Sequence, residues 1–211
     1  MKTIIFATSN AGKMREIRQI MADLPVEILS MKEAGIDIDI VEDGKTFEEN
    51  ACIKAEAIRD YIRSAGEDSP LAVYKDAVVL ADDSGLEIDH LHKEPGVYSA
   101  RYMGEDTSYD IKNAKLIQRL EGVSDEERTA RFVCVIAAAA PGAGETKTCR
   151  GTIEGRIGYK PEGDNGFGYD PIFYVPEFGC TTAQLTPEQK NLVSHRGKAL
   201  RGIKKAICTW L

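Results

Sequence analysis

The feature that most constrains the fold is the irregular mixture of strand-like and helix-like segments along the chain. Residues 3–8 form a short apolar run rich in β-branched side chains, and the polar residues 9–12 follow it directly. Met14, Ile17 and Met21 then recur at helical spacing, which predicts a strand, a tight loop and a helix. Strands and helices also mix further along, but without the strict alternation of a doubly wound fold. The pattern favours an α/β fold in which helices flank a mixed β-sheet.

The remaining elements follow from similar patterns. Three more amphipathic helices are expected, around the apolar stripes in residues 47–62, 111–120 and 199–210. The first has a capping sequence, with Thr46 as the cap and Glu49 three positions later. The second stripe consists of Ile111, Ala114, Ile117 and Leu120. Further strands are expected at residues 78–81, 131–140 and 146–153, the last two as an antiparallel hairpin. The polar segment 64–76 is expected to be a surface connection.

Length and composition indicate one folded body. The chain has 211 residues, of which 43% are hydrophobic and 29% are charged, as is typical of a globular domain. It contains no internal repeat and no low-complexity linker. We therefore predict a single α/β domain over residues 1–211, and a small antiparallel lobe around residues 85–155 is compatible with it.

The charge balance limits the partners that the chain can bind. Lys and Arg number 27 against 34 Asp and Glu, so the formal net charge is −7, and no basic block stands out. Long nucleic acids are therefore not expected as partners, because their binding depends on neutralising many phosphates. A single nucleotide is not excluded by this argument.

The sequence predicts a cytoplasmic location without membrane insertion. The first residues lack the apolar core and cleavage site of a signal peptide, and 18 consecutive apolar residues occur nowhere. The five cysteines form no Cys-x-x-Cys pair and suit a reducing compartment. All five are expected to be small buried hydrophobic residues, at positions Cys52, Cys134, Cys149, Cys180 and Cys208.

The loop between the first strand and the first helix is a candidate phosphate site. Hydroxyl groups, backbone N–H groups and the helix N-terminus converge there. It is not a Walker A loop, because the first glycine is missing and Met14 follows the lysine. The alternative is a polar turn with a solvated lysine. The candidate residues are Thr8, Ser9, Asn10, Ala11, Gly12 and Lys13.

Carboxylates form a second candidate site. Asp82 and Asp83 are expected at the C-terminal end of an apolar strand, the edge where open α/β sheets place ligands. On an extended chain they face opposite sides, and such hard oxygen ligands suit Mg²⁺. The alternative is an aspartate-rich turn. Glu42 is the other expected metal ligand, although Asp43 could exchange roles with it.

Two segments near the C-terminus could hold a nucleobase. Residues 163–171 combine three glycines, which allow close backbone approach, with the aromatic Phe167 and Tyr169. A glycine-rich turn with core aromatics is the alternative. Lys190, His195 and Arg196 could donate to a base edge or to phosphates. No motif for covalent catalysis competes with this set.

Taken together, these motifs resemble the inosine triphosphate pyrophosphatase family over nearly the whole chain. Six motifs occur in order, at residues 8–13, 46–55, 81–86, 95–102, 166–171 and 194–197. The resemblance implies an elongated mixed α/β fold with two lobes and a central cleft, a homodimer and Mg²⁺ dependence. It also implies cleavage of deaminated purine nucleoside triphosphates between the α- and β-phosphates, giving a monophosphate and pyrophosphate.

The resemblance also implies roles for individual residues. Residues 8–13 would bind the triphosphate, and Asp83 would bind the metal and activate the attacking water. The substrate itself would be held by Ser84, Phe167, Gly168, Tyr169, Asp170, Lys190, His195 and Arg196. The connection at residues 59–78 looks longer than in bacterial members. A non-catalytic nucleotide sensor and a phosphohydrolase with another base or product remain rival hypotheses.

Overall fold

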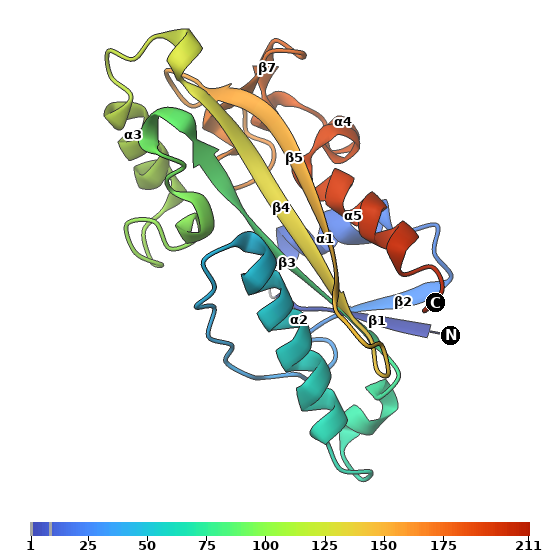
Figure 1. The fold of residues 1–211 in the computed structure, drawn as a ribbon. Coiled ribbons are helices and arrows are strands. Elements are labelled where there is room, and N and C mark those ends of the chain that lie inside the picture. Colours follow the sequence, from blue (N-terminus) through green and yellow to red (C-terminus); the bar gives the residue numbers. More distant parts are fainter. Residues whose placement is uncertain (1, 9) are drawn as a thin grey trace. The chain divides into compact units, whose positions relative to one another are not determined.

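A computed structural model describes residues 2–8 and 10–211 and contains one seven-stranded sheet (Figure 1). The strand order is β2-β1-β3-β4-β5-β6-β7. The strands are β1 Lys2–Phe6, β2 Val26–Ser30, β3 Val78–Ile88, β4 Thr129–Ala139, β5 Lys147–Ile157, β6 Phe173–Val175 and β7 Cys180–Thr181. The helices are α1 Ala11–Ile20, α2 Phe47–Ser64, α3 Tyr109–Arg119, α4 Pro187–Val193 and α5 His195–Ala206.

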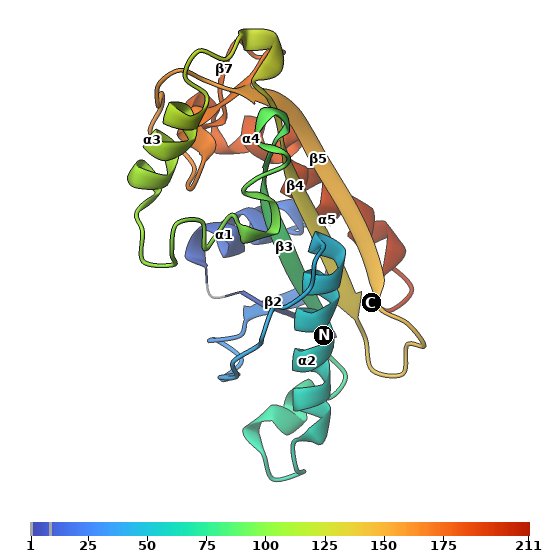
Figure 2. The ribbon, with the colours of Figure 1, turned by 60° about the vertical axis from the view of Figure 1, so that its left-hand side comes forward.

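Strand directions make the sheet mixed. β1 pairs in parallel with both β2 and β3, whereas β6 pairs antiparallel with β5 and with β7. β4 and β5 are long neighbours joined as a hairpin, and the view turned by 60° shows the loop that connects them (Figure 2). The expected mixed α/β fold is therefore confirmed.

The chain divides into two compact units, and strands β3, β4 and β5 contribute to both. The first unit comprises residues 1–83, 134–150 and 198–211, and the second comprises residues 84–133 and 151–197. The second unit extends well beyond the antiparallel lobe expected around residues 85–155. The single domain over residues 1–211 stays a prediction.

Each unit has its own apolar core, which is formed by the apolar faces of its strands and helices. In the first unit, Ile4 and Phe6 of β1 pack with the buried faces of α1 and α5, including Ile17 and Ile203. In the second, Leu86 and Ile88 of β3 pack with residues of β5 and β6 such as Phe173. Burial of such side chains is the main favourable contribution to folding.

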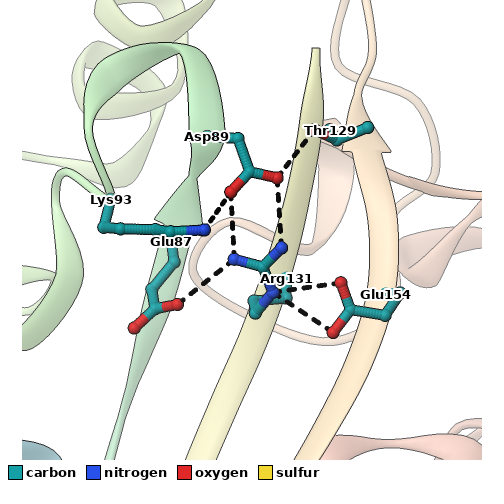
Figure 3. A network of polar contacts seen from close by, with 6 residues as sticks. All are labelled: Glu87, Asp89, Lys93, Thr129, Arg131 and Glu154. Carbon is teal, nitrogen blue, oxygen red and sulfur yellow. Dashed lines mark hydrogen bonds and ion pairs between the residues drawn. The ribbon is translucent and has the colours of Figure 1, made fainter. Parts of the chain in front are cut away.

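A network of charged side chains joins strands of the second unit (Figure 3). The Arg131 guanidinium donates two hydrogen bonds of 3.1 Å to Asp89 and lies 3.0 Å from Glu154 and 3.4 Å from Glu87. Asp89 also accepts from Thr129 at 2.7 Å and pairs with Lys93. One guanidinium thus links β3, β4, β5 and the turn after β3.

β3 is longer than the sequence predicted. It was expected over residues 78–81, with Asp82 and Asp83 beyond its end, but the strand continues without interruption to Ile88. The two aspartates therefore lie inside the strand, and the expected position at its C-terminal end is wrong. Both are buried, so burial of the strand outweighs the low strand propensity of aspartate.

The face of α3 also differs from the prediction. Ile111 and Ala114 are exposed, whereas Lys112 and Asn113 are buried with Leu116. Lys112 compensates for its burial, because its ammonium donates to the Ala100 carbonyl at 2.7 Å. The apolar stripe was therefore wrong for the first turns of this helix.

The cysteines were only partly predicted. All five are thiols outside any disulfide, but Cys134 alone is buried and Cys208 is exposed. The others are intermediate, so burial of all five is contradicted. Among residues 2–8 and 10–211, no helix is long and apolar enough to cross a membrane.

Candidate active site

The register of β1 and β3 places the candidate phosphate loop next to the candidate carboxylates within the first unit. Phe6 pairs with Leu80, and the Ala7 N–H donates to the Leu80 carbonyl at 2.7 Å. Thr8 and Asp82, each two residues further along, therefore lie next to each other, with Thr8 just after the end of β1 and Asp82 within β3.

The loop is held by the N-terminal cap of α1. The Asn10 side chain accepts from the Lys13 N–H at 3.0 Å, and the Asn10 N–H donates to the Thr8 hydroxyl at 3.2 Å. Ala11 and Gly12 form the first turn of the helix, where N–H groups suit an anion. Ser9 lies outside the described residues. The other five candidate residues of the loop lie together.

Lys13 turns its ammonium toward the sheet. Its Nζ lies 2.8 Å from the Asp82 carboxylate, which is buried. The pair puts a cation beside the candidate phosphate loop and gives the buried carboxylate a counter-charge.

Asp83 lies in a different cluster, which α2 supplies. Asn50 Nδ2 donates to Asp83 Oδ2 at 3.1 Å. Lys54 Nζ donates to Glu42 Oε2 at 2.7 Å and stands 3.8 Å from Asp83 Oδ1. The alternation of side chains along β3 thus sends Asp82 to Lys13 and Asp83 to Asn50 and Lys54. The two aspartates face opposite ways, as predicted.

Burial and neighbouring charges set the protonation of this cluster. Burial raises the pKa of Asp83, and Glu42 and Asp82 raise it further, while Lys54 and Asn50 oppose the rise. Burial tends to lower the pKa of Lys54, but Asp83, Asp82 and Glu42 outweigh it, so the pKa is raised. Lys54 is therefore held as an ammonium, and Asp83 has a higher affinity for a proton than an exposed aspartate.

The first unit offers oxygen donors for a divalent cation. Glu42 and Asp83 both approach the Lys54 ammonium, at 2.7 and 3.8 Å, and Asp82 approaches the Lys13 ammonium at 2.8 Å. Such carboxylate oxygens fit Mg²⁺, which takes one or two carboxylates and leaves its other positions to water and phosphate. No cluster of three or more His, Cys, Asp or Glu side chains among residues 2–8 and 10–211 could hold a metal alone. Asp43 is exposed, so the geometry favours Glu42.

In the second unit, Asp170 organises the glycine-rich loop. Its Oδ2 accepts from the Phe167 N–H at 2.8 Å and from Lys190 Nζ at 2.7 Å, and its Oδ1 accepts from the Thr182 hydroxyl at 2.8 Å. Gly166 lies so close that a Cβ there would meet Asp170 Oδ2 at 2.2 Å. The carboxylate is thus used to shape the loop.

Phe167 lies beneath two cations of the same unit. Lys190 Nζ stands 4.7 Å from the ring centroid, and the Arg196 guanidinium carbon stands 5.5 Å from it. Arg196 also donates to the Ser84 hydroxyl at 3.3 Å. His195 stacks on Phe132 with centroids 4.9 Å apart. These five predicted residues and Asp170 therefore share one region of the second unit.

Tyr169 and Gly168 lie at the inner side of that loop. The Tyr169 hydroxyl donates to the Ser99 carbonyl at 2.7 Å, and its ring meets Tyr109 edge-on at 5.2 Å. Asn113 Nδ2 donates to the Gly168 carbonyl at 3.2 Å. The Tyr169 side chain is thus packed in the protein, and burial raises its pKa.

Sequence reasoning did not select Asn50, Lys54, Thr182 or Asn113 as functional. A signal existed for the first two. They stand four positions apart on α2, among the buried Phe47, Ala51, Ala55 and Ile58, where a polar pair on an apolar face needs a partner. Asn113 carried no such signal, because the face of α3 was misassigned.

Comparison with known proteins identifies the family. The model of the Ham1 family matches residues 4–206. This chain belongs to the Ham1 family. It is 49% identical to the dITP/XTP pyrophosphatase of Clostridium perfringens over 97% of this chain and 96% of the relative. It is 44% identical to the dITP/XTP pyrophosphatase of Bacillus subtilis, with 98% of each chain covered.

Solved Ham1 structures share the fold. The Ham1 protein of Staphylococcus aureus matches with a TM-score of 0.81 and 41% identity, covering 99% of each chain. The HAM1 protein of Coxiella burnetii matches with a TM-score of 0.82 and 38% identity, covering 99% of this chain and 100% of the other. The resemblance in the six motifs therefore identified the family correctly.

Proposed function

We propose that this Ham1 protein hydrolyses deaminated purine nucleoside triphosphates such as ITP, dITP and XTP to the monophosphate and pyrophosphate. The observation that carries the proposal is the cluster of Lys13, Lys54, Glu42, Asp82 and Asp83 beside a helix N-terminus. Cations and N–H groups suit a triphosphate, while carboxylates suit a metal and a reacting water. The relatives named dITP/XTP pyrophosphatase support the choice of substrate.

The reaction would break the bond between the α-phosphorus and the oxygen that bridges to the β-phosphate. A water oxygen bonds to the α-phosphorus, the electron pair of the broken bond leaves with pyrophosphate, and Asp83 accepts the proton of the water. Its raised pKa makes Asp83 a better base than an exposed aspartate. Lys13 and the first turn of α1 hold the phosphates and offset their charge.

Glu42 and Asp83 would hold Mg²⁺, which when bound supplies positive charge to the leaving pyrophosphate. Lys54 keeps Glu42 and Asp83 facing each other by standing between them.

The second unit would supply the contacts to the base and the sugar. Hypoxanthine and xanthine, the bases of inosine and xanthosine, carry a carbonyl oxygen where adenine carries an amino donor, and Arg196 can only donate. Adenine would leave two donors facing each other, at a cost of about 1–3 kcal/mol, or about 10- to 100-fold in selectivity. Phe167 offers an aromatic ring beside the guanidinium. Ser84, Gly168, Tyr169, Asp170, Lys190 and His195 complete the proposed set.

The test is a panel of nucleoside triphosphates with Mg²⁺, read as released phosphate with and without inorganic pyrophosphatase. We expect rapid turnover of dITP, ITP and XTP, slow turnover of ATP and GTP, and phosphate only after pyrophosphatase treatment. Phosphate without that treatment would indicate removal of the γ-phosphate. Binding without turnover would indicate a nucleotide sensor, and equal turnover of ATP would refute base selection by Arg196.

We also propose that the protein acts as a homodimer in the cytoplasm. Support comes from the resemblance in the sequence motifs and from the five free cysteines, which suit a reducing compartment. Light scattering of the purified protein tests the dimer, and cell fractionation tests the location.

A further inference from the structure

Asn50 joins the two chain segments that carry the proposed metal ligands. Its side chain is 1% exposed, and its Nδ2 donates to Asp83 Oδ2 at 3.1 Å. Its Oδ1 accepts from the Gly44 N–H at 2.9 Å. Gly44 stands two residues after Glu42 in the chain. One buried amide on α2 thus contacts β3 with its donor end and the loop before α2 with its acceptor end.

Both ends of this amide are chemically determined. A carboxylate can only accept, so the NH₂ group must face Asp83, and a backbone N–H can only donate, so the oxygen must face Gly44. The loop approaches closely, because a Cβ on Gly44 would meet Asn50 Oδ1 at 2.6 Å. No other uncharged amino acid of similar size could place an NH₂ donor toward Asp83 and a carbonyl acceptor toward Gly44 from position 50.

Asp83 needs such a partner, because the torsion that turns its carboxylate is broad and roughly two-fold. Asn50 holds Oδ2, and Oδ1 consequently stands on the side of Lys54, at 3.8 Å from its Nζ. Without the amide, either oxygen of Asp83 could face the ammonium of Lys54, and the carboxylate could take several orientations. The amide therefore selects one orientation of the carboxylate.

We propose that Asn50 is a positioning residue that aims the Asp83 carboxylate for the proposed hydrolysis. The proposal rests on the proposed function, since it assigns Asn50 a role in that reaction. Asn50 acts through Asp83 and leaves the binding of the triphosphate to other residues. Its loss should therefore lower kcat and leave KM nearly unchanged, because a displacement of about 1 Å at a reacting group can cost about 100-fold in rate.

The first experiment measures steady-state kinetics of Asn50→Ala, Asp83→Asn and the double variant on dITP. We expect Asn50→Ala to lower kcat by about 10- to 100-fold with KM within about threefold of wild type. In the Asp83→Asn background the same change should cost less than about twofold, because residues that act as a unit are not additive. An equal cost in both backgrounds, or a change confined to KM, would overturn the proposal.

The second experiment reads the contact without activity. Asn50→Asp keeps an oxygen toward Gly44 but sets a carboxylate against Asp83, so the melting temperature should fall by about 4 °C or more. Adding Asp83→Asn restores a donor and acceptor pair with the partners exchanged, and should recover most of the loss. Additive losses in the double variant would show that the two side chains do not meet in solution.

A control separates loosening of α2 from misalignment of Asp83. Thr146 donates to Glu56 of the same helix at 2.5 Å, away from the carboxylate cluster. Thr146→Val should lower the melting temperature while kcat stays at the wild-type value. If Thr146→Val lowers kcat as much as Asn50→Ala does, Asn50 is structural only and the proposal fails.

The wild-type protein and the Asn50 variant test the proposed function and the role of Asn50 separately. A wild-type protein that hydrolyses no triphosphate in the panel would overturn the proposed function and the role of Asn50 with it. Normal turnover by the wild type together with normal kcat of Asn50→Ala would overturn the role of Asn50 alone.

Discussion

Lys13 and Asp82 form an ion pair of 2.8 Å in which the carboxylate is buried and the ammonium is partly open to solvent. The lysine is therefore placed to exchange part of this contact for a phosphate oxygen without leaving its position. Asp82 thus contacts a lysine in the first turns of α1, whereas Asp83 faces the other way. Each aspartate can be tested through its own partner.

Lys13→Ala should raise KM for dITP by about 10- to 100-fold with a smaller effect on kcat, because a hydrogen bond to a charged group contributes about 1.5–3 kcal/mol. The contact would be present in both the ground state and the transition state. Steady-state kinetics at saturating Mg²⁺ measure both constants. Lys160, whose side chain is 76% exposed, provides a matched alanine control. Wild-type KM and kcat in Lys13→Ala would refute its assigned place.

Asp83→Asn should lower kcat by about 10² to 10⁴, the usual contribution of a general base. The fold should persist, because the asparagine keeps the volume and can still accept from Asn50 through its amide oxygen. Circular dichroism and single-turnover rates check the two statements. Asp82→Asn should cost less activity, since Asp82 contacts Lys13. If Asp82→Asn is inactive while Asp83→Asn is nearly normal, the two roles are reversed.

Gly166→Ala should disrupt the loop that carries Phe167. Gly166 has a φ of +79° and its Cβ would meet the Asp170 carboxylate at 2.2 Å, so both strain and a clash are expected. KM for dITP should rise, and the melting temperature should fall. Gly142→Ala is the matched control, because Gly142 has a φ of +76° with nothing within 4 Å of an added Cβ. If both substitutions changed KM and the melting temperature equally, the clash with Asp170 would not explain the effect of Gly166→Ala.

Asp89 should contribute to stability in a pH-dependent manner. Burial acts to raise its pKa, but hydrogen bonds from Arg131, Lys93 and Thr129 outweigh it and hold the pKa well below the usual 3.8 (Figure 3). The stabilisation is therefore present above about pH 4 and is lost as the pH falls through the lower pKa of the folded state. Asp89→Asn should destabilise by about 1 kcal/mol at pH 7 and by less at pH 3.

Urea unfolding at both pH values measures this difference. Glu162→Gln, which removes a carboxylate from an exposed pair with Lys160, should change stability by less than about 0.5 kcal/mol at pH 7. A deficit of Asp89→Asn that is the same at pH 3 and pH 7 would contradict the ionic origin of the stabilisation.

Much of the fold could be predicted because its signals are local. The cap Thr46 with Glu49 forms a capping box as expected, and α1 follows β1 as predicted, although it begins at Ala11, within the expected loop. The end of β3 could not be predicted in this way. Aspartates and a glycine indicate a turn, but here their side chains find partners on α1 and α2 that are distant in sequence. Tertiary contacts outweighed the local preference.

The same distinction separates the predicted and the missed site residues. Lys13, Asp83 and Arg196 stood in motifs that were read from neighbouring residues. Asn50 and Lys54 stood in the motif over residues 46–55, but their contacts with Asp83 depend on an encounter between α2 and β3, which local patterns do not encode. On α3, the buried Lys112 ammonium donates a hydrogen bond to the Ala100 carbonyl. Hydrophobic periodicity does not predict that a lysine faces the protein interior.

The uninterrupted course of β3 restricts how this region can vary in length. Successive residues of a strand advance by about 3.3 Å and their side chains point to opposite faces. Asp82 and Ser84 therefore share one face of β3, and Asp83 points to the other face. Inserting or deleting one residue between Leu80 and Asp83 would reverse those directions and bring each aspartate to the other's partner. The exposed connection before β3 can absorb such changes. In β3 itself, a change of one residue would alter which side chain contacts which partner.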